Sequence, residues 1–480
     1  MKRFLSLALA TMLSLGVLSG CGGDTQTNSD TQGQSEATQS ANDEPTTEST
    51  DNDSTNSSGE KTTLTITFRD DGFVEDGSAW KWYKIASESY AKKDEVEINI
   101  SPIQASEGDY FAKIALQLAS DNPPDIVQED TFQLPNDVAA GYLTDLTDYL
   151  KDYPEWTDGS YYESLKNGVT VDDRAYAIPY NTDTRGLWYN KDICEAAGLS
   201  RDWQPNNWEE IFTTLNTIKE KNPDIVPFWM NSGVATGEAT SMQTYEMLLY
   251  ATGGRLMDDA GEKWVVKSPE IIKALDYVDR IYKEELGPPL SLVLNGQASN
   301  TSAREYLPQG KLAVSLDGSW IVGNYNEEGA SPWPEYGEAL GFASFPTDEG
   351  QEPKTMTLAG GWGLAIPENS KNKEAAFDFM KHCMDPAVYT KAVINMGSIT
   401  TRTDVAQSEE YSSIPFKLIA TEFLQSAEFR PKNDQYSQVS TCIQEMVEAV
   451  ASGNSTPQVA MEKYATDVAR IVGDGNVVEK

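Results

Sequence analysis

Residues 62–128 have the pattern of two helices placed between three strands, and this constrains the fold more than any other feature. The segment "TLTITF" places Leu64, Ile66 and Phe68 on one face of a strand. It is followed by the helical stretch "SAWKWYKIASESYAKK", the alternating strand "EVEINI", a second helix ending before Pro123, and a short strand at 126–128. Such units form a mainly parallel sheet with right-handed crossovers. Ligands of these sheets bind at the carboxyl ends of the strands.

Strand and helix patterns continue over the rest of the chain. We expect strands in "RGLWYN" and "LAVSLDGSW", and a helix followed by a strand in "NNWEEIFTTLNTIKEKNPDIVPFWM". Asn207 and Glu210 have the spacing of a capping box. Further helices are expected in "KSPEIIKALDYVDRIYKE", in the stretch ended by Pro386, and twice near the C-terminus. The roughly 420 residues from Lys61 onward predict two lobes rather than one core.

The N-terminus has the features of an export signal. Lys2 and Arg3 precede a short apolar run that stops at Cys21. The tetrad Leu18-Ser19-Gly20-Cys21 resembles the lipobox of bacterial lipoproteins, which implies a signal peptide at 1–20 and lipidation of Cys21. An ordinary signal peptide with a chance cysteine is the alternative. Residues 21–60 are polar and acidic, without Lys or Arg, which predicts a disordered tether.

Composition excludes several classes of function. The formal net charge of −38 argues against nucleic acid and against an anionic membrane surface as partners. With one histidine, His382, and no CxxC spacing, no metal site is expected. Cys383 and Cys442 could pair, but with Cys194 left over we favour three free thiols. No nucleophile elbow, HExxH or phosphate loop is present, so we expect neither an enzyme nor a cofactor.

Five motifs in order give the chain a family resemblance. They are "GYLTDLTDYL", "YAIPYNTDTRGLWYNKDICEAAGL", "NNWEEI", "GKLAVSLDGSW" and "LAGGWGLAIPENSKNKEAAFDFM". Together they resemble the extracellular solute-binding proteins of family 1, the maltose-binding-protein-like group that serves ABC importers. The resemblance implies a monomeric protein that captures a small solute and passes it to the transmembrane subunits of an ABC permease.

The resemblance also implies an α/β, two-lobed periplasmic-binding-protein fold of type II, with discontinuous lobes joined by hinge crossovers. It places the N-lobe at residues 61–181 and 349–397, and the C-lobe at residues 182–348 and 398–473. The crossovers are expected near Asn181–Arg185, near Phe345–Gly350 and around Gly397–Thr401. The lobes would close on a solute in the cleft between them.

Tryptophans beside polar residues in turns after strands are the features that a sugar site needs, because an indole covers the apolar face of a sugar ring. Trp320 in "LDGSW" is the first candidate, since in the family an aromatic residue at this motif packs on a sugar. Asp317 could bond hydroxyl groups or only form the turn before Gly318. Trp362 follows Gly361, where glycines allow close backbone approach.

Other candidates follow the remaining strands. Trp229 and Asn231 end a strand of the C-lobe. Asp130, with Glu129 as its competitor, follows the third strand of the N-lobe. Asp70 or Asp71 follows the first strand.

Four further tryptophans and two arginines could serve either in packing or in the cleft. We expect Trp188 in the core, and Trp80, Trp82 and Trp208 in helix packing. Arg402 and Arg430 could reach the cleft rim, but structural ion pairs are the preferred interpretation.

We therefore expect a lipid-anchored protein on the outer face of the cytoplasmic membrane, with a Gram-positive cell surface favoured, that binds a mono- or oligosaccharide. Two alternatives remain. The same fold could bind a polyamine or a peptide, or the chain could be a surface glycoside hydrolase. The acidic composition leaves a polyamine open, while acidic residues are too numerous for any pair to identify a hydrolase.

Overall fold

A computed structural model of the chain describes residues 61–70, 77–105 and 107–480. The predicted signal peptide, the tether, Cys21 and Asp71 lie outside these residues. The described residues belong to one compact unit, whose two largest sheets, of five and four strands, have separate hydrophobic cores.

The first sheet has the strand order β2-β1-β3-β14-β6. Strand β1 pairs in parallel with β2 and β3, and β14 pairs antiparallel with β3 and β6. Helices α1 and α2 connect the first three strands, which confirms the predicted alternation. Leu64, Ile66 and Phe68 are buried as their spacing predicted. The bounds are β1 Thr62–Asp70, α1 Ser78–Ser89, β2 Val96–Gln104, α2 Glu107–Leu118, β3 Ile126–Asp130, β6 Ala177–Thr182 and β14 Gly361–Ala365.

The second sheet has the order β11-β7-β10-β8, with β8 parallel and β7 antiparallel to β10. Its strands are β7 Arg185–Asn190, β8 Val226–Trp229, β10 Leu312–Gly318 and β11 Leu340–Ala343. Helix α8 (Trp208–Lys221) begins at the predicted cap, where Asn207 Oδ1 accepts a hydrogen bond of 2.9 Å from the Glu210 amide. We call the part built on the first sheet the first lobe, and the part built on the second sheet the second lobe.

The chain passes between the two sheets between β6 and β7, at residues 183–184. This passage lies inside the expected range of Asn181–Arg185. The second passage lies at Gly360, ten residues beyond the expected Phe345–Gly350. The intervening hairpin of β12 (Phe345–Pro346) and β13 (Thr355–Ala359) packs Phe345, Met356 and Leu358 into the core of the second lobe.

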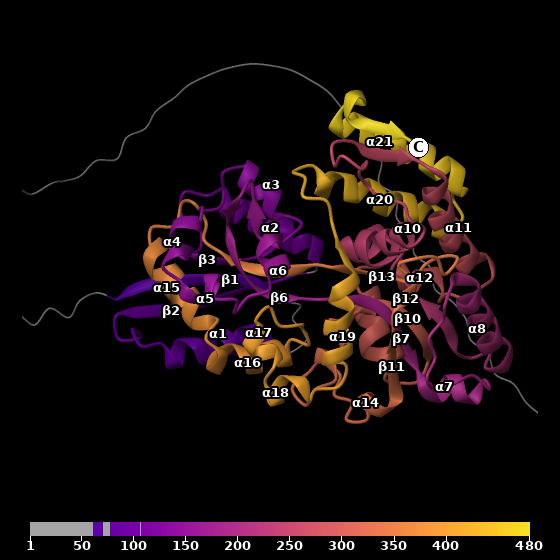
Figure 1. Ribbon diagram of the computed structural model, residues 1–480, viewed down its shortest axis with the longest axis horizontal. Helices are drawn as coiled ribbons and strands as arrows, with labels where there is room; N and C mark the ends of the chain where they lie inside the picture. Colours follow the sequence, from indigo (N-terminus) through magenta and orange to yellow (C-terminus); the bar gives the residue numbers. More distant parts are fainter. Residues whose placement is uncertain (1–60, 71–76, 106) are drawn as a thin grey trace, which may run out of the picture. The chain divides into compact units, whose positions relative to one another are not determined.

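The third passage is more extended than the predicted 397–401. Ile399 packs with the second lobe, whereas Val405 and Tyr411 return to the core of the first lobe. The chain leaves the first lobe only before Phe416, which packs with the second. Short helices carry this detour, namely α16 Pro386–Asn395, α17 Thr403–Ala406, α18 Glu409–Ser412 and α19 Lys417–Phe423. Figure 1 shows the orange helices α15 and α16 beside the indigo strands of the first lobe.

The two helices expected near the C-terminus, α20 (Tyr436–Ala451) and α21 (Pro457–Val472), pack on the second lobe through their apolar faces. Strand β16 (Val477–Glu479) pairs with β9 (Trp264–Lys267). Cys194 and Cys383 are buried free thiols and Cys442 is a half-buried one. Across the described part of the chain, none of the helices has the length and apolar character that crossing a bilayer requires.

The remaining elements connect these parts. They are α3 Leu134–Ala139, α4 Thr147–Lys151, α5 Pro154–Thr157, α6 Glu163–Gly168, β4 Thr170–Val171, β5 Arg174–Ala175, α7 Lys191–Ala196, η1 Val234–Thr236, α9 Glu238–Thr240, η2 Ser241–Glu246, α10 Met247–Ala251, α11 Pro269–Lys283, α12 Leu290–Val293, α13 Ala298–Thr301, η3 Ser302–Tyr306, η4 Ser319–Asn324, α14 Tyr336–Ala339, α15 Lys373–Cys383, η5 Leu424–Ser426, β15 Ala427–Phe429 and η6 Asp474–Asn476.

Candidate ligand-binding site

A cavity of about 420 Å³ lies between the two lobes. Residues at the carboxyl ends of β1, β3 and β10 line it, together with the start of α1, the first passage between the lobes, and the segment 296–304. The cavity therefore lies where the sheet topology predicts a ligand, at the carboxyl ends of parallel strands.

Trp320 enters this cavity from the second lobe. It lies in η4, directly after β10. The guanidinium carbon of Arg185 lies 4.9 Å from the centre of its ring, within the range of a cation–π contact. The ring folds back over Gly318, where an added Cβ would lie 1.9 Å from a ring carbon. Glycine at this position and Arg185 together hold the indole in place.

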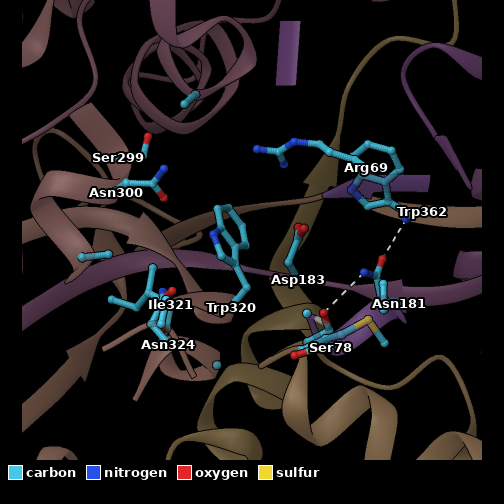
Figure 2. Close-up of a pocket in the computed structure, with 18 of the residues that line it drawn as sticks. Arg69, Ser78, Asn181, Asp183, Ser299, Asn300, Trp320, Ile321, Asn324 and Trp362 are labelled. Atoms are coloured by element: carbon cyan, nitrogen blue, oxygen red, sulfur yellow. Dashed lines mark hydrogen bonds between the residues drawn. The ribbon is translucent and has the colours of Figure 1, made fainter. Parts of the chain in front are cut away.

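Trp362 enters from the first lobe, on β14. Its ring is stacked on Phe111 at a centroid distance of 5.8 Å and an interplanar angle of 13°. Its backbone N–H donates a hydrogen bond of 2.8 Å to Asn181 Oδ1. Figure 2 shows Asp183 between the two indoles, with the Asn181–Trp362 bond dashed. Two aromatic side chains from different lobes therefore line one cavity.

Gly361 permits the backbone approach beside Trp362. It also lines the cavity, and its φ of 147° lies in the region that favours glycine. An added Cβ would lie 2.4 Å from the carbonyl oxygen of Asn181. The expectation of close backbone packing at "AGGWG" is therefore met by the geometry of this residue.

Trp80 also lines the cavity, which corrects the expectation that it serves only in helix packing. It lies in the first turn of α1, and this helix begins close to the carboxyl end of β1. Trp82, one half-turn further, is buried and donates a hydrogen bond of 3.0 Å from Nε1 to the carbonyl of Cys383. Trp188 and Trp208 are buried as expected.

The predicted acidic residues occupy different places. Asp70 and Asp130, at the ends of β1 and β3, both line the cavity. Glu129 does not, because adjacent strand residues point to opposite faces. It is buried beside Asp137, and burial raises the pKa of Glu129 well above its usual value, with the Asp137 and Asp130 carboxylates raising it further.

Asp317 lies on the cavity wall but is 3% exposed. Its Oδ1 accepts a hydrogen bond of 2.7 Å from the Gly318 amide, as in the predicted turn. Burial raises the pKa of Asp317 to about 7, against the opposing effects of the Gly318 amide and Arg185. Near neutral pH this carboxyl group can therefore either accept or donate a hydrogen bond.

Trp229 and Asn231 do not line the cavity. Trp229 is buried in the core of the second lobe, with its ring centroid 5.2 Å from that of Tyr306. Asn231 is also buried and accepts a hydrogen bond of 3.0 Å at Oδ1 from Ser299, which does line the cavity. The segment 296–304 lies between the end of β8 and the cavity, and the sequence gives no sign of this.

The two arginines differ in their surroundings. Arg402 pairs with Asp404 and lies outside the cavity wall, as the preferred interpretation stated. Arg430 makes structural ion pairs as well, with Asp130 at 2.8 Å and with Glu238 at 3.1 Å. However, it also lines the cavity.

Several polar residues of the wall were missed from the sequence. Asn181 and Asp183 belong to "YNTDTRG", which was identified only as a crossover, and its polar residues between two strands were an available signal. Ser299, Asn300 and Asn324 come from irregular or short helical segments, and no pattern marks them. Figure 2 shows these three beside Trp320, on the side of the second lobe.

Charged side chains of the wall are largely paired with each other. Asp183 pairs with Arg185, and Arg430 pairs with both Asp130 and Glu238. Exchange of these partners for a charged ligand would leave a buried charge without compensation. The cavity therefore combines indole faces with hydrogen-bonding groups of small net charge, which suits a neutral ligand rich in hydroxyl groups.

Comparisons with known proteins agree with this description. A family model described as "Bacterial extracellular solute-binding protein" matches residues 75–389. A probable ABC transporter-binding protein of Deinococcus radiodurans is 24% identical over 346 residues, which cover 69% of this chain and 77% of that protein. The diacetylchitobiose binding protein DasA of Streptomyces coelicolor is 26% identical over 56% of this chain and 58% of its own length.

A solved structure of an ABC transporter solute-binding protein has a similar fold. The solute-binding protein of an ABC transporter from Thermotoga lettingae TMO, bound with α-D-tagatose, superimposes with a TM-score of 0.74 and 26% sequence identity. The match covers 86% of this chain and 100% of that chain.

Proposed function

Because the chain belongs to the bacterial extracellular solute-binding protein family, we propose that it captures a neutral sugar or short oligosaccharide between its two lobes. The solute is then delivered to the membrane permease of an ABC importer. The observation that carries this proposal is the cavity between the lobes, which is lined by indoles from both lobes and by charged groups that are paired with each other.

Capture depends on contacts that the closed arrangement makes with the solute. A sugar held between Trp320 and Trp362 touches both lobes, so it binds the closed arrangement more tightly than the open one. Only such a difference in affinity can shift a conformational equilibrium. Hydrogen bonds from hydroxyl groups to charged side chains contribute about 1.5–3 kcal/mol each.

Attachment to the membrane through Cys21 completes the proposal. It rests on the lipobox-like tetrad and the apolar run before it. More than one acyl chain is needed for stable anchoring, because each buried methylene group contributes only about 0.8 kcal/mol. Metabolic labelling with an alkyne-bearing palmitate tests this point, and Cys21→Ser is expected to abolish the label.

A thermal-shift screen tests the choice of solute. The panel contains D-tagatose, N,N′-diacetylchitobiose, maltose, mannitol, spermidine and a tripeptide. A ligand at 100 times its dissociation constant is expected to stabilise the protein by about 2.7 kcal/mol. Stabilisation by spermidine or the tripeptide, with no response to any sugar, would contradict the sugar proposal. Separate incubation of the protein with the oligosaccharides, followed by analysis of the products, tests the hydrolase alternative, which released monosaccharides would favour.

The variant Trp320→Ala is our first prediction. Loss of the indole is expected to weaken the binding of the responding sugar by about 2 kcal/mol, or roughly thirtyfold, as measured by isothermal titration calorimetry. Trp333→Ala is the matched control. Trp333 is also half-buried in the second lobe, against Tyr325, but it does not line the cavity. Equal losses in both variants would show that Trp320 acts through stability alone.

A further inference from the structure

One wall of the cavity is formed by contacts between the lobes themselves. Phe132 follows β3 of the first lobe, yet its ring is buried in the core of the second lobe. It contacts Tyr436 of α20 edge-on, at a centroid distance of 6.0 Å. On its other side it contacts Phe111 of α2 at 4.9 Å, and Phe111 is the ring on which Trp362 is stacked. An aromatic row therefore runs from the cavity into the second lobe.

Arg430 joins the lobes beside this row. Its Nη2 donates a hydrogen bond of 2.8 Å to Asp130 Oδ1 in the first lobe. Its Nη1 donates a hydrogen bond of 3.1 Å to Glu238 Oε2 in the second lobe. Its guanidinium carbon lies 4.7 Å from the centre of the Phe132 ring. Arg430 itself follows β15, which pairs with β13 of the second lobe. The guanidinium thus links carboxylates that belong to different lobes.

The surroundings fix this geometry. The side chains of Arg430, Asp130 and Glu238 are only 6, 8 and 9% exposed. Glu238 accepts further hydrogen bonds from Ser241 at 3.1 Å and from Ser440, and its Oε2 lies 3.0 Å from the Tyr436 hydroxyl oxygen. Asp130 Oδ1 accepts another from the Phe132 amide at 3.1 Å. Buried ion pairs are weakly screened by solvent, and removal of one partner leaves uncompensated charge.

We propose that Arg430 is a positioning residue that gives the ligand-free protein a closed population by bridging Asp130 and Glu238 across the two lobes. The bridge consists of protein groups alone, so it forms without a solute. If only a fraction of the molecules is competent to bind, the apparent affinity falls by that fraction. The Arg430 bridge thereby raises affinity without itself having to contact the solute. The inference adds to the proposed function, but its main test requires no sugar.

The test measures the distance between the lobes in the ligand-free protein. Spin labels are placed at Leu116→Cys on α2 and Val459→Cys on α21, which are 76% and 61% exposed and belong to different lobes. Cys442, the half-buried thiol, is replaced by Ser throughout. In double electron–electron resonance, we expect Arg430→Met to lower the ratio of short to long distances by about tenfold or more.

The matched control is Arg402→Met. Arg402 is a buried arginine too, at 3% side-chain exposure, but its partner Asp404 lies in the same segment of the chain. We expect this variant to lose stability and to keep the distance distribution of the parent. An unchanged distribution in Arg430→Met would overturn the proposal. An equal change in both variants would also overturn it, because general destabilisation would then be the cause.

A second variant covers the case in which Arg430→Met does not fold. The triple variant Arg430→Met, Asp130→Asn, Glu238→Gln removes the charges of all three bridging groups, so that neither carboxylate is left without the guanidinium. The same loss of short distances in this variant would support the proposal, and a distribution like that of the parent would overturn it. If no solute in the panel binds, the proposed function fails, while this measurement still decides the role of Arg430.

Discussion

At the scale of single residues, Glu246 is a buried carboxyl group whose pKa lies far from its ordinary value. It is fully buried in η2, where Oε1 accepts a hydrogen bond of 2.5 Å from Tyr436. Oε2 has no hydrogen-bond partner among the residues that the structure describes. Burial, together with the nearby Glu238 carboxylate, raises the pKa of Glu246 to about 8, against the effects of Tyr436, Arg430 and Arg185.

This pKa predicts how stability depends on pH. The folded protein binds one more proton at Glu246 than the unfolded chain between pH 4.5, the ordinary value, and about pH 8. The free energy of unfolding therefore falls as pH rises through this window, by up to about 1.4 kcal/mol per pH unit from this group. Above about pH 8 the contribution is constant.

The variant Glu246→Gln is expected to lose this slope and to be more stable than the parent at pH 8. Urea denaturation of both proteins at pH 5, 6.5 and 8 measures the free energy of unfolding and its dependence on pH. Glu262→Gln is the control, because it makes the same substitution at an exposed glutamate. If the free energy of unfolding depends on pH in the same way in the parent and in Glu246→Gln, the inference that the Glu246 carboxyl group is protonated in the folded state is wrong.

At the scale of elements, neighbouring residues were enough to predict where several helices start. The N-cap residue is Asn207 in α8, Ser268 before Pro269 in α11, and Thr456 before Pro457 in α21. In each case the cap side chain accepts a hydrogen bond from a backbone amide three residues later. Such caps are read from neighbouring residues, so they need no knowledge of the rest of the fold.

The cap of α8 supports a prediction. Asn207→Ala removes the acceptor of the Glu210 amide and is expected to lower the free energy of unfolding by about 1 kcal/mol. Asn207→Asp keeps an acceptor at the same place and is expected to retain most of the stability. Urea denaturation of the three proteins measures both effects. A loss in Asn207→Asp as large as that in Asn207→Ala would show that the cap is not the source of stability.

The lobe boundaries that differ from the prediction are those that depend on packing between elements. With the second crossover expected near Phe345–Gly350, strand β13 of the β12–β13 hairpin was assigned to the first lobe. Only the burial of Phe345, Met356 and Leu358 in one core assigns it to the second lobe. The segment 399–416 likewise alternates between the two cores, and its short helices are individually compatible with either lobe.

At the scale of the whole compact unit, closure is the testable event. With the same pair of spin labels, a saturating concentration of the responding sugar is expected to move the remaining long distances to short ones. Trp362→Ala, at the same sugar concentration, is expected to leave a larger share of long distances, because the sugar then loses its stacking contact on the first lobe. If Trp362→Ala closes as fully as the parent, the contact between the sugar and Trp362 does not drive closure.

The sequence by itself determined the features that depend on periodicity and local chemistry. The alternation of Leu64, Ile66 and Phe68 marked a buried strand, and the succession of strands and helices marked an α/β fold with its ligand at the strand ends. Because Trp320 and Asp130 lie at or just beyond the carboxyl ends of strands, their position in the cavity wall could be predicted. Trp229 also lies at the carboxyl end of a strand, β8, but it does not line the cavity.

Only the tertiary structure decided which distant segments complete the cavity. Arg430 lies 300 residues from Asp130 and 192 from Glu238 along the chain, and these residues meet only when the lobes are assembled. Ser299 and Asn300 line the cavity because their segment covers the end of β8, where it shields Asn231. Periodicity reports which face of an element is buried, whereas contacts between elements depend on how the whole chain packs.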